Sequence, residues 1–397
     1  MESSRAKKLI DEYLTYEEAK QLLVKLVQFP SPQTALLEKE PQVLALIQQT
    51  IRPELEKDGI RPIIDDKGNL IATLKGEEDQ GKSLLLVSYA MNAAPATMQN
   101  PYSGEIVDGT PYQIEGECVW GRGACEQKGS LAAMMLAIKI IARCQAKLPA
   151  DLIFATSTAG ETGRHLSVNH ILNHNKIKTD WGILDGPPQI QLGNKGRIDI
   201  LVTVKGKPTH SSRPWDGINA IQGAVKVLEK LDPLMPYPSE RAHPKLGQVS
   251  LTPTSIQSFP KATHTVPAEC QILLDRRLLP GDDPNEAVED LKTAIGEIDP
   301  YEVKIRGEDF SYPSEVTKDA EIVSALEQSI RTMLGREPEY TFASAALDAG
   351  LLNREGIQSV SYGPRDFRFQ HTDNELVSIT DVFETAKVFA HIALSRG

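Results

Sequence analysis

Three acidic residues occupy positions where an α/β enzyme could use them chemically. Glu126 lies in a glycine-containing loop, Glu161 lies in another loop after an apolar segment, and Asp185 directly follows an apolar segment. Carboxylates at such positions can bind a divalent metal ion or accept a proton. Each has a plainer interpretation too, because loop acids are commonly solvated and an Asp before Gly-Pro commonly forms a turn. The acids taken singly therefore leave both interpretations open.

Strands that alternate with helices would position these acids. The apolar segment 129–144 is typical of a helix buried against a sheet. Short strand-like runs occur at 61–64, 70–74, 84–89, 152–156, 182–184 and 359–362. This alternation predicts an α/β fold with a mostly parallel sheet that is sandwiched by helices. Ligands of such sheets bind at the carboxyl ends of the strands, where the acids and Ala90 would gather.

The pattern changes near Arg197. An alternating segment at 198–204 is followed by a helix at 218–231, a proline-rich loop, two more strands and a helix at 284–295. This predicts a smaller α+β domain at 197–311. It would interrupt a catalytic-type α/β domain formed by residues 1–196 and 312–397.

Four motifs make the chain resemble the M20 family of metallopeptidases and deacylases, which includes acetylornithine deacetylase, succinyl-diaminopimelate desuccinylase, aminoacylase-1 and glutamate carboxypeptidase. They are Trp-Gly-Arg-Gly-Ala-Cys-Glu-Gln-Lys-Gly at 120–129, Gly-Lys-Pro-Thr-His-Ser-Ser-Arg-Pro-Trp-Asp-Gly-Ile-Asn-Ala at 206–220, Asp-Arg-Arg-Leu-Leu-Pro-Gly at 275–281 and His-Thr-Asp-Asn-Glu at 371–375. Each motif is weak alone, but the similarity runs in order along nearly the whole chain. It implies a zinc-exopeptidase-like catalytic domain and an inserted dimerisation (lid) domain, and therefore a homodimer.

The resemblance also implies a centre of two metal ions, usually zinc, that share one carboxylate. Glu126 stands at the bridging position, where the family has Asp. Glu161 and His371 match the other ligands of one ion, and Asp185 matches the acidic ligand of the first ion. Three protein ligands with an open fourth position can hold a catalytic zinc ion, which activates water and polarises a carbonyl. His371 alone would more often be structural, and the surrounding motif favours a ligand.

Besides Glu126, three positions depart from the family pattern. Ala90 replaces the His that binds the first ion, and Asn92 replaces the Asp that supports that His. Gly160 stands where the family has the Glu that acts as general base. We therefore expect at most one divalent ion, zinc before manganese or cobalt, and a metal-free protein is the other possibility.

Two further roles follow from the resemblance. His210 matches the inserted-domain His that reaches the partner subunit's active site and stabilises the oxyanion. Asp185, if no metal ion engages it, would act as the base.

Two functions fit these features. The first is an M20-type amidohydrolase, an N-acyl amino acid deacylase or a dipeptidase/carboxypeptidase-like enzyme, whose metal-dependent hydrolysis is impaired or altered. The alternative is a catalytically inactive dimer that binds a small amide or amino-acid derivative, or that partners an active enzyme.

Composition restricts the partners and the location. The formal net charge is -11 and no Lys/Arg cluster occurs, which argues against a nucleic-acid partner. No apolar run approaches the length of a membrane span, so we expect no membrane partner. The first residues lack the apolar core of a signal peptide, and the four cysteines form no CxxC pair. We therefore expect a cytoplasmic protein.

Overall fold

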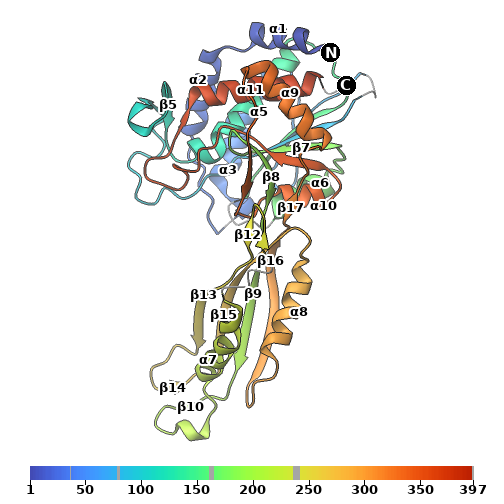
Figure 1. Cartoon of the computed structure of the whole chain (residues 1–397). Coiled ribbons are helices and arrows are strands. Elements are labelled where there is room, and N and C mark those ends of the chain that lie inside the picture. Colours follow the sequence, from blue (N-terminus) through green and yellow to red (C-terminus); the bar gives the residue numbers. More distant parts are fainter. Residues whose placement is uncertain (36, 78–80, 161–164, 236–241, 396–397) are drawn as a thin grey trace. The chain divides into compact units, whose positions relative to one another are not determined.

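The computed structural model describes residues 1–35, 37–77, 81–160, 165–235 and 242–395 (Figure 1). The chain divides into two compact units. Unit 1 comprises Met1–Leu192, Val316–Thr341 and Leu351–Gly397, and unit 2 comprises Gly193–Glu315 and Phe342–Gly350. Segments 193–196, 312–315 and 342–350, which the sequence places in the larger domain, are grouped with unit 2.

Unit 1 is built around a sheet whose central strands are parallel. These are β6 (Leu152–Ser157), β3 (Leu84–Tyr89), β7 (Trp181–Leu184) and β19 (Gln358–Ser361), in that order. Further strands extend the sheet: β1 (Ile63–Ile64), β2 (Leu70–Leu74), β8 (Ile190–Asn194), β17 (Ser314–Glu315) and β18 (Tyr340–Ala343). Of these, β17 belongs to unit 2, and β8 and β18 each contain residues of both units. The pairs β1–β2, β2–β6, β19–β8 and β8–β17 are antiparallel. A separate antiparallel sheet contains β4 (Glu105–Asp108), β5 (Glu117–Trp120) and β20 (Leu376–Ser378).

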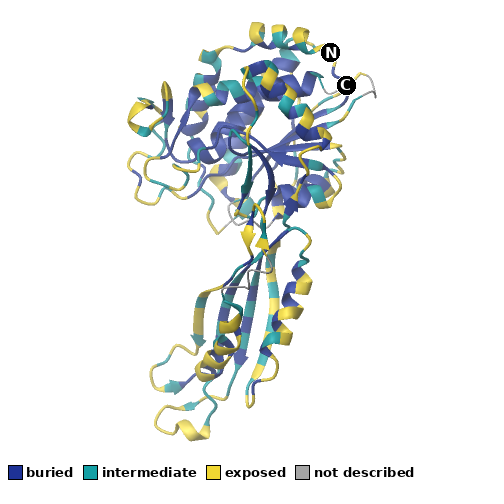
Figure 2. Ribbon diagram, in the orientation of Figure 1, coloured by how far each residue is buried: buried dark blue, intermediate teal, exposed yellow. Residues whose placement is uncertain are grey.

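Helices cover the central sheet and bury it. Helix α5 (Gly129–Arg143) contacts β3 and β6 as well as α2 (Tyr16–Val27) and α11 (Ile379–Ser395), and it is buried along nearly its whole length (Figure 2). The remaining helices are α1 (Ser3–Tyr13), α3 (Pro41–Leu46), α4 (Arg52–Glu56), α6 (Leu166–His174), α9 (Glu321–Leu334) and α10 (Ala349–Arg354). The predicted α/β fold class, with a mostly parallel central sheet, is confirmed.

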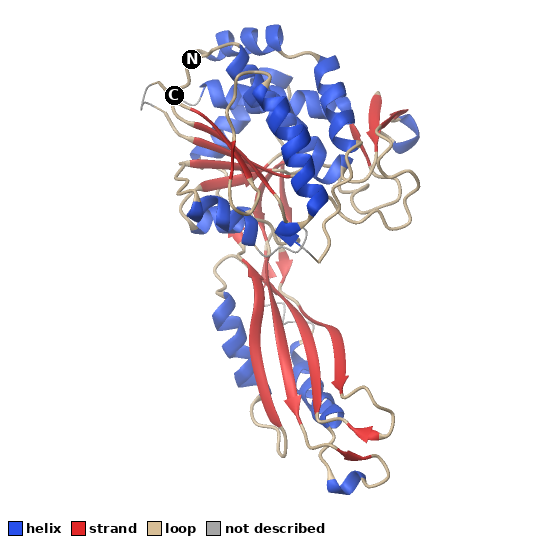
Figure 3. Ribbon diagram, turned by 180° about the vertical axis from the view of Figure 1, so that it is seen from behind, coloured by secondary structure: helices blue, strands red, loops and turns tan. Residues whose placement is uncertain are grey.

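Unit 2 is an antiparallel sheet that carries two helices (Figure 3). Its strand order is β13 (Leu251–Phe259), β15 (Glu269–Leu278), β9 (Gly196–Lys205) and β16 (Glu302–Ser311). Burial alternates along β9 and β15, so one face of each strand packs in a core with α7 (Ala220–Leu231) and α8 (Pro284–Ile295). Two short strand pairs complete the unit: β10 (Thr209–His210) with β14 (Thr265–Val266), and β11 (Ala242–His243) with β12 (Gly247–Gln248).

Among the described residues, no helix combines the length and the apolar composition that crossing a membrane requires.

Candidate metal centre

The carboxyl ends of three neighbouring parallel strands gather residues from distant parts of the chain. Asp185 follows β7, and Ala90 follows β3. Leu184, the last residue of β7, pairs with Val87 of β3 on one side and with Ser361 of β19 on the other. The loops that leave these strands therefore begin at the same edge of the sheet, as the sequence predicts for ligand sites of such folds.

Glu126 is presented by a distorted turn in front of α5. Residues Ala124–Lys128 form a π-helical turn, a local irregularity that is frequent at functional sites. Gly123, which precedes this turn, has a φ of 80°, and a Cβ added there would lie 2.6 Å from the Cβ of Asn92. Only glycine satisfies both the left-handed backbone and this close approach. The Gly-Arg-Gly motif thus packs the Glu126 turn directly against the segment that follows β3.

Glu126 and His371 meet as the resemblance implies. His371 Nε2 lies 3.0 Å from Glu126 Oε1, and Gln370 Nε2 donates a hydrogen bond to the same oxygen. The Glu126 side chain is only 6% exposed, whereas that of His371 is 52% exposed. The pair therefore consists of a buried carboxylate and an imidazole that solvent can reach. Glu126 Oε2 is buried and has no hydrogen-bond partner among the described residues.

The charge on Glu126 is stabilised despite its burial. Burial by itself favours the neutral acid, but the hydrogen bond with His371 and the positive charge of Arg365 outweigh it, so the pKa of Glu126 lies below its ordinary value. Glu126 is therefore a buried anion, and one of its oxygens has no hydrogen-bond partner in the part of the chain that the structure describes. Such an oxygen is suited to bind a cation.

Asp185 has a different partner, Arg365. The Arg365 Nη2 group forms an ion pair with Asp185 Oδ2, and both side chains are at most 8% exposed. The same guanidinium donates to the backbone carbonyl of Glu126, from Nε at 3.0 Å and from Nη2 at 2.6 Å. Arg365 therefore lies between Asp185 and the Glu126 turn. Sequence reasoning did not identify this residue, and no local motif marks it.

A second buried ion pair holds the Glu126 turn. Glu375 Oε1 accepts a hydrogen bond from the Glu126 backbone N at 3.2 Å, and Glu375 Oε2 accepts from Arg122 Nη1 at 3.1 Å. Burial is the largest influence on Glu375 and raises the pKa of this carboxyl. These contacts join the 120–129 and 371–375 motifs, which are far apart in the sequence.

The three altered positions are accommodated by the surrounding structure. Asn92 is fully buried, accepts a hydrogen bond from Ser31 Oγ at 2.9 Å and donates to Ala93 O at 2.7 Å. At Gly160, an added Cβ would lie 2.6 Å from the Tyr89 ring and 2.8 Å from Met91 Cε. A Glu side chain at 160 therefore requires Tyr89 and Met91 to move. Ala90 is fully buried, and its N–H donates to Ser157 O at 2.9 Å.

Two further residues were expected in the site, Glu161 and His210. Glu161 falls outside the described residues. His210 lies in unit 2, where its exposed ring contacts Ser212 Oγ at 2.8 Å and has its centroid 6.0 Å from that of His264. Its proposed action as an oxyanion donor stays a prediction.

A further group in unit 1 could hold a metal ion at the surface. His170 and His174, one turn apart on α6, stack with ring centroids 4.5 Å apart, and Asp66 lies 2.6 Å from His170 Nε2 and 3.6 Å from His174 Nε2. This trio is half-buried at most. Any measurement of bound metal must therefore separate it from Glu126 and His371.

Comparisons with known proteins identify what the whole chain is similar to. The family model for peptidase family M20/M25/M40 matches residues 93–395. Acetylornithine deacetylase from Myxococcus xanthus is 26% identical over 339 residues, which cover 82% of this chain and 84% of that protein. An M20 family metallo-carboxypeptidase from Sulfolobus solfataricus superposes with a TM-score of 0.73 at 19% identity and covers 94% of this chain and 98% of its own.

A dinuclear metal-binding peptidase of the M20 family from Bacillus subtilis superposes with a TM-score of 0.68 at 15% identity. The match covers 96% of this chain and 97% of that chain. At these identities the two superpositions establish a shared fold.

Proposed function

This chain belongs to peptidase family M20/M25/M40, and from that premise we propose that it hydrolyses the amide bond of a small N-acyl amino acid or dipeptide-like substrate with one divalent metal ion. The family was predicted from four motifs, and its membership is confirmed. The substrate class is taken from the deacylases and peptidases that the chain resembles. Zinc is the first choice of ion, before manganese or cobalt.

One observation carries the proposal: a buried, ionised Glu126 keeps an oxygen without a hydrogen-bond partner among the described residues, next to His371. A carboxylate and an imidazole are donors that zinc accepts. Glu161, which the family resemblance adds to this set, lies outside the described residues. The Glu126–His371 pair therefore fits one ion. His371 contacts Glu126 Oε1, and Glu126 Oε2 accepts no hydrogen bond from the described residues.

Different residues of this chain would have different roles in hydrolysis. Glu126 and His371 would hold the ion, which when bound activates water and polarises the scissile carbonyl. Glu375 and Arg122 keep the Glu126 turn in place. His210 would donate a hydrogen bond to the developing oxyanion. Asp185 Oδ2 is engaged by Arg365, so a role for Asp185 as base would compete with this ion pair.

Gly160 supports the second candidate, a protein that binds such amides without hydrolysing them. The space next to Gly160 is occupied by the Tyr89 ring and Met91, so a Glu could stand at this position only if both side chains moved. Loss of a general base commonly lowers the rate by about 10²–10⁴. The two candidates therefore predict different turnover on the same ligand site.

A combined metal and turnover measurement tests the proposal. Elemental analysis would be made on a His170→Ala/His174→Ala background, so that the surface trio contributes no ion. We expect one zinc per chain and slow hydrolysis within a panel of N-acetyl, N-succinyl and dipeptide substrates. Bound ligand without turnover would favour the second candidate, and two ions per chain would contradict the one-ion site.

His210 can be tested against a neighbouring histidine. His210→Ala should lower kcat by about 100-fold, because an oxyanion donor acts mainly in the transition state. His264→Ala, which removes an exposed ring beside it in unit 2, should leave kcat unchanged. Equal effects of the two substitutions would remove His210 from the mechanism.

Homodimerisation remains part of the proposal and is supported by exposed apolar residues of unit 2. Ile221 and Val225, one turn apart on α7, are 41% and 47% exposed, and Ile256 on the edge strand β13 is 54% exposed. Exposed edge strands readily pair with another chain. Ile256→Lys should shift the mass measured by light scattering from dimer towards monomer, whereas Thr252→Lys on the same strand gives a control for added charge.

A further inference from the structure

We propose that the Arg365 guanidinium is a permanent cation that replaces the first metal ion of the family centre, so that the Asp185 half of the site is closed to metal. A solved relative of the same fold is described as dinuclear. The residues of this chain do not fit two ions. On this proposal Arg365 occupies the place where a dinuclear centre would hold its first ion.

Backbone hydrogen bonds fix the position of Arg365. The loop after β19 is joined to the loop after β7 by three of them: Tyr362 N to Leu184 O at 3.0 Å, Gly363 N to Pro187 O at 2.9 Å, and Arg365 N to Gly186 O at 3.0 Å. Asp185 lies within the segment that accepts these bonds. The Arg365 side chain therefore starts beside Asp185 and reaches the Glu126 turn.

The two acids around Arg365 are those that the family resemblance assigns to the first ion, Glu126 as the bridge and Asp185 as the terminal ligand. Arg365 neutralises Asp185 directly and binds the main-chain carbonyl of Glu126. A buried carboxylate requires such a partner, because removing it from water is costly unless a cation compensates it. A planar guanidinium meets a carboxylate and a carbonyl at once with directed N–H groups.

The altered residues near β3 agree with this substitution. A metal-binding His at position 90 has no function if the cation is part of the chain, and position 90 is Ala. Asn92 uses its amide in neutral hydrogen bonds with Ser31 and Ala93 instead of supporting a His. The two substitutions and Arg365 therefore form one consistent set.

Arg365 changes what the Asp185 half of the centre can do. A guanidinium supplies positive charge but, unlike a metal ion, it has no coordination position at which water can be activated. Metal chemistry would then be confined to Glu126 and His371. This inference shares that ion with the proposed function but does not require hydrolysis, because its readouts are metal content and thermal stability.

The test is a factorial comparison of zinc content, again on the His170→Ala/His174→Ala background. Ala90→His/Asn92→Asp restores the missing family groups, and the same variant with Arg365→Gly also removes the guanidinium. We expect the double substitution to bind no additional zinc and the triple substitution to bind one more zinc per chain. The increment is the readout, so it is informative whatever the parent binds.

Two outcomes would overturn the inference. They are an extra zinc in Ala90→His/Asn92→Asp while Arg365 is intact, or no extra zinc in a folded triple variant. If the proposed hydrolysis is absent but the increment is seen, the inference stands and only the proposed function fails. If turnover is found but the extra zinc is not, the inference about Arg365 fails and the proposed function stands.

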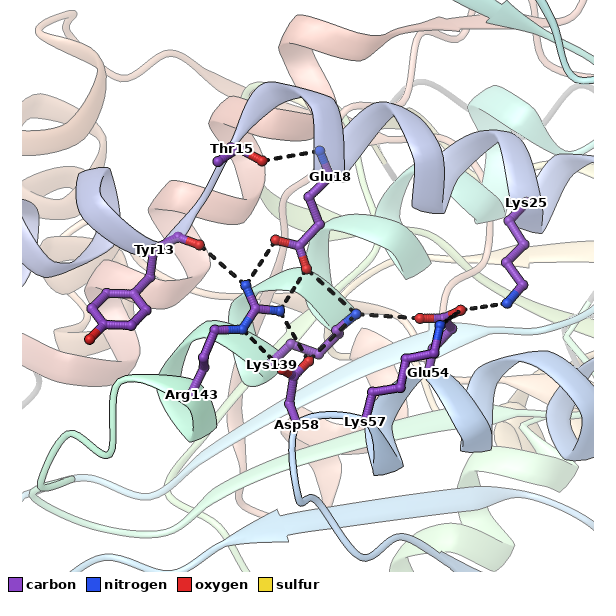
Figure 4. A network of polar contacts seen from close by, with 9 residues as sticks. All are labelled: Tyr13, Thr15, Glu18, Lys25, Glu54, Lys57, Asp58, Lys139 and Arg143. Carbon is purple, nitrogen blue, oxygen red and sulfur yellow. Dashed lines mark hydrogen bonds and ion pairs between the residues drawn. The ribbon is translucent and has the colours of Figure 1, made fainter.

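Single substitutions keep the inference testable if the multiple variants do not fold. Arg365→Met removes the charge and Arg365→Lys keeps it, so we expect a clearly larger fall in Tm for Arg365→Met. Equal falls would contradict a cationic role. Arg143→Met, which removes an arginine paired with Glu18 and Asp58 in unit 1 (Figure 4), is the matched control and should leave zinc content unchanged.

Discussion

The two halves of the candidate centre contain the same kind of residue in opposite electrostatic situations. In one half, Glu126 is buried beside a half-exposed His371 and keeps an oxygen without a hydrogen-bond partner in the described part of the chain. In the other half, Asp185 is equally buried but is paired with Arg365, a cation supplied by the chain itself. The difference is therefore in the partner and not in the acid.

If Arg365 replaces the first ion, as we propose, the comparison explains how a two-metal fold can lose one ion without collapse. A buried carboxylate is tolerated when a cation compensates it, and a protein cation serves that structural purpose as well as a metal ion. On this proposal the remaining ion would bind at the Glu126 half, where Oε2 has no hydrogen-bond partner among the described residues. In relatives of a dinuclear enzyme, each acidic residue of the site can thus be examined separately, to see whether a metal ion or a side chain of the protein neutralises it.

The largest effect is expected at His371. His371→Ala should abolish zinc binding at the Glu126 half and reduce turnover to background, because it removes the only nitrogen ligand of the expected set and leaves two carboxylates, Glu126 and Glu161. His264→Ala is the control for loss of an exposed imidazole, and it should retain the ion. Retention of zinc by His371→Ala would break the comparison, since Glu126 would then need no histidine.

The next effect concerns the Asp185–Arg365 pair. Asp185→Asn leaves Arg365 buried without its anion and should lower the free energy of unfolding by about 3–5 kcal/mol in urea denaturation. The double variant Asp185→Asn/Arg365→Met should lose less than the sum of the single variants, because both partners of one contact are then removed. Strict additivity would mean that the two residues do not stabilise each other.

The sequence predicts the acids of both halves far better than it predicts Arg365. Glu126 lies in a recognisable glycine motif and Asp185 at the end of an apolar strand, so their placement follows from local pattern and from the parallel sheet. Segment 129–144 was expected to be a buried helix, and α5 spans Gly129–Arg143. Such elements are predictable because hydrophobic periodicity is local.

Arg365 escaped prediction for a physical reason. It follows Gly-Pro in a loop, where an arginine is ordinarily solvated. Its partner Asp185 is 180 positions away, and the two meet only because β19 lies beside β7. The Tyr89 ring beside Gly160 is a similar case, since a strand residue fills space left by a residue in another loop. Contacts of this kind depend on tertiary packing, which no motif encodes.

The smallest effect is expected at Glu54, a buried acid that resembles Asp185 in being neutralised by the chain. Lys57 Nζ lies 2.7 Å from Glu54 Oε1, Lys139 Nζ lies 3.5 Å from Oε2, and Lys25 also pairs with this carboxylate (Figure 4). Burial, the largest influence, acts to raise the pKa of Glu54, but these lysines together overcome it and lower the pKa to about 2.

Because the folded-state pKa of Glu54 is depressed, its stabilising contribution is present above the ordinary carboxyl pKa of about 4.5 and is lost as pH falls towards 2. Glu54→Gln should therefore lower the urea midpoint near pH 7, and the difference from the wild type should shrink between pH 4.5 and 2. Glu56→Gln on the same helix removes only an exposed pair with Arg52 and should change the midpoint little. Added zinc should change neither the urea midpoint of Glu54→Gln nor that of Glu56→Gln relative to the wild type, because lysines already neutralise Glu54. If zinc restored the midpoint of Glu54→Gln, the idea that a carboxylate neutralised by the chain binds no metal would be contradicted.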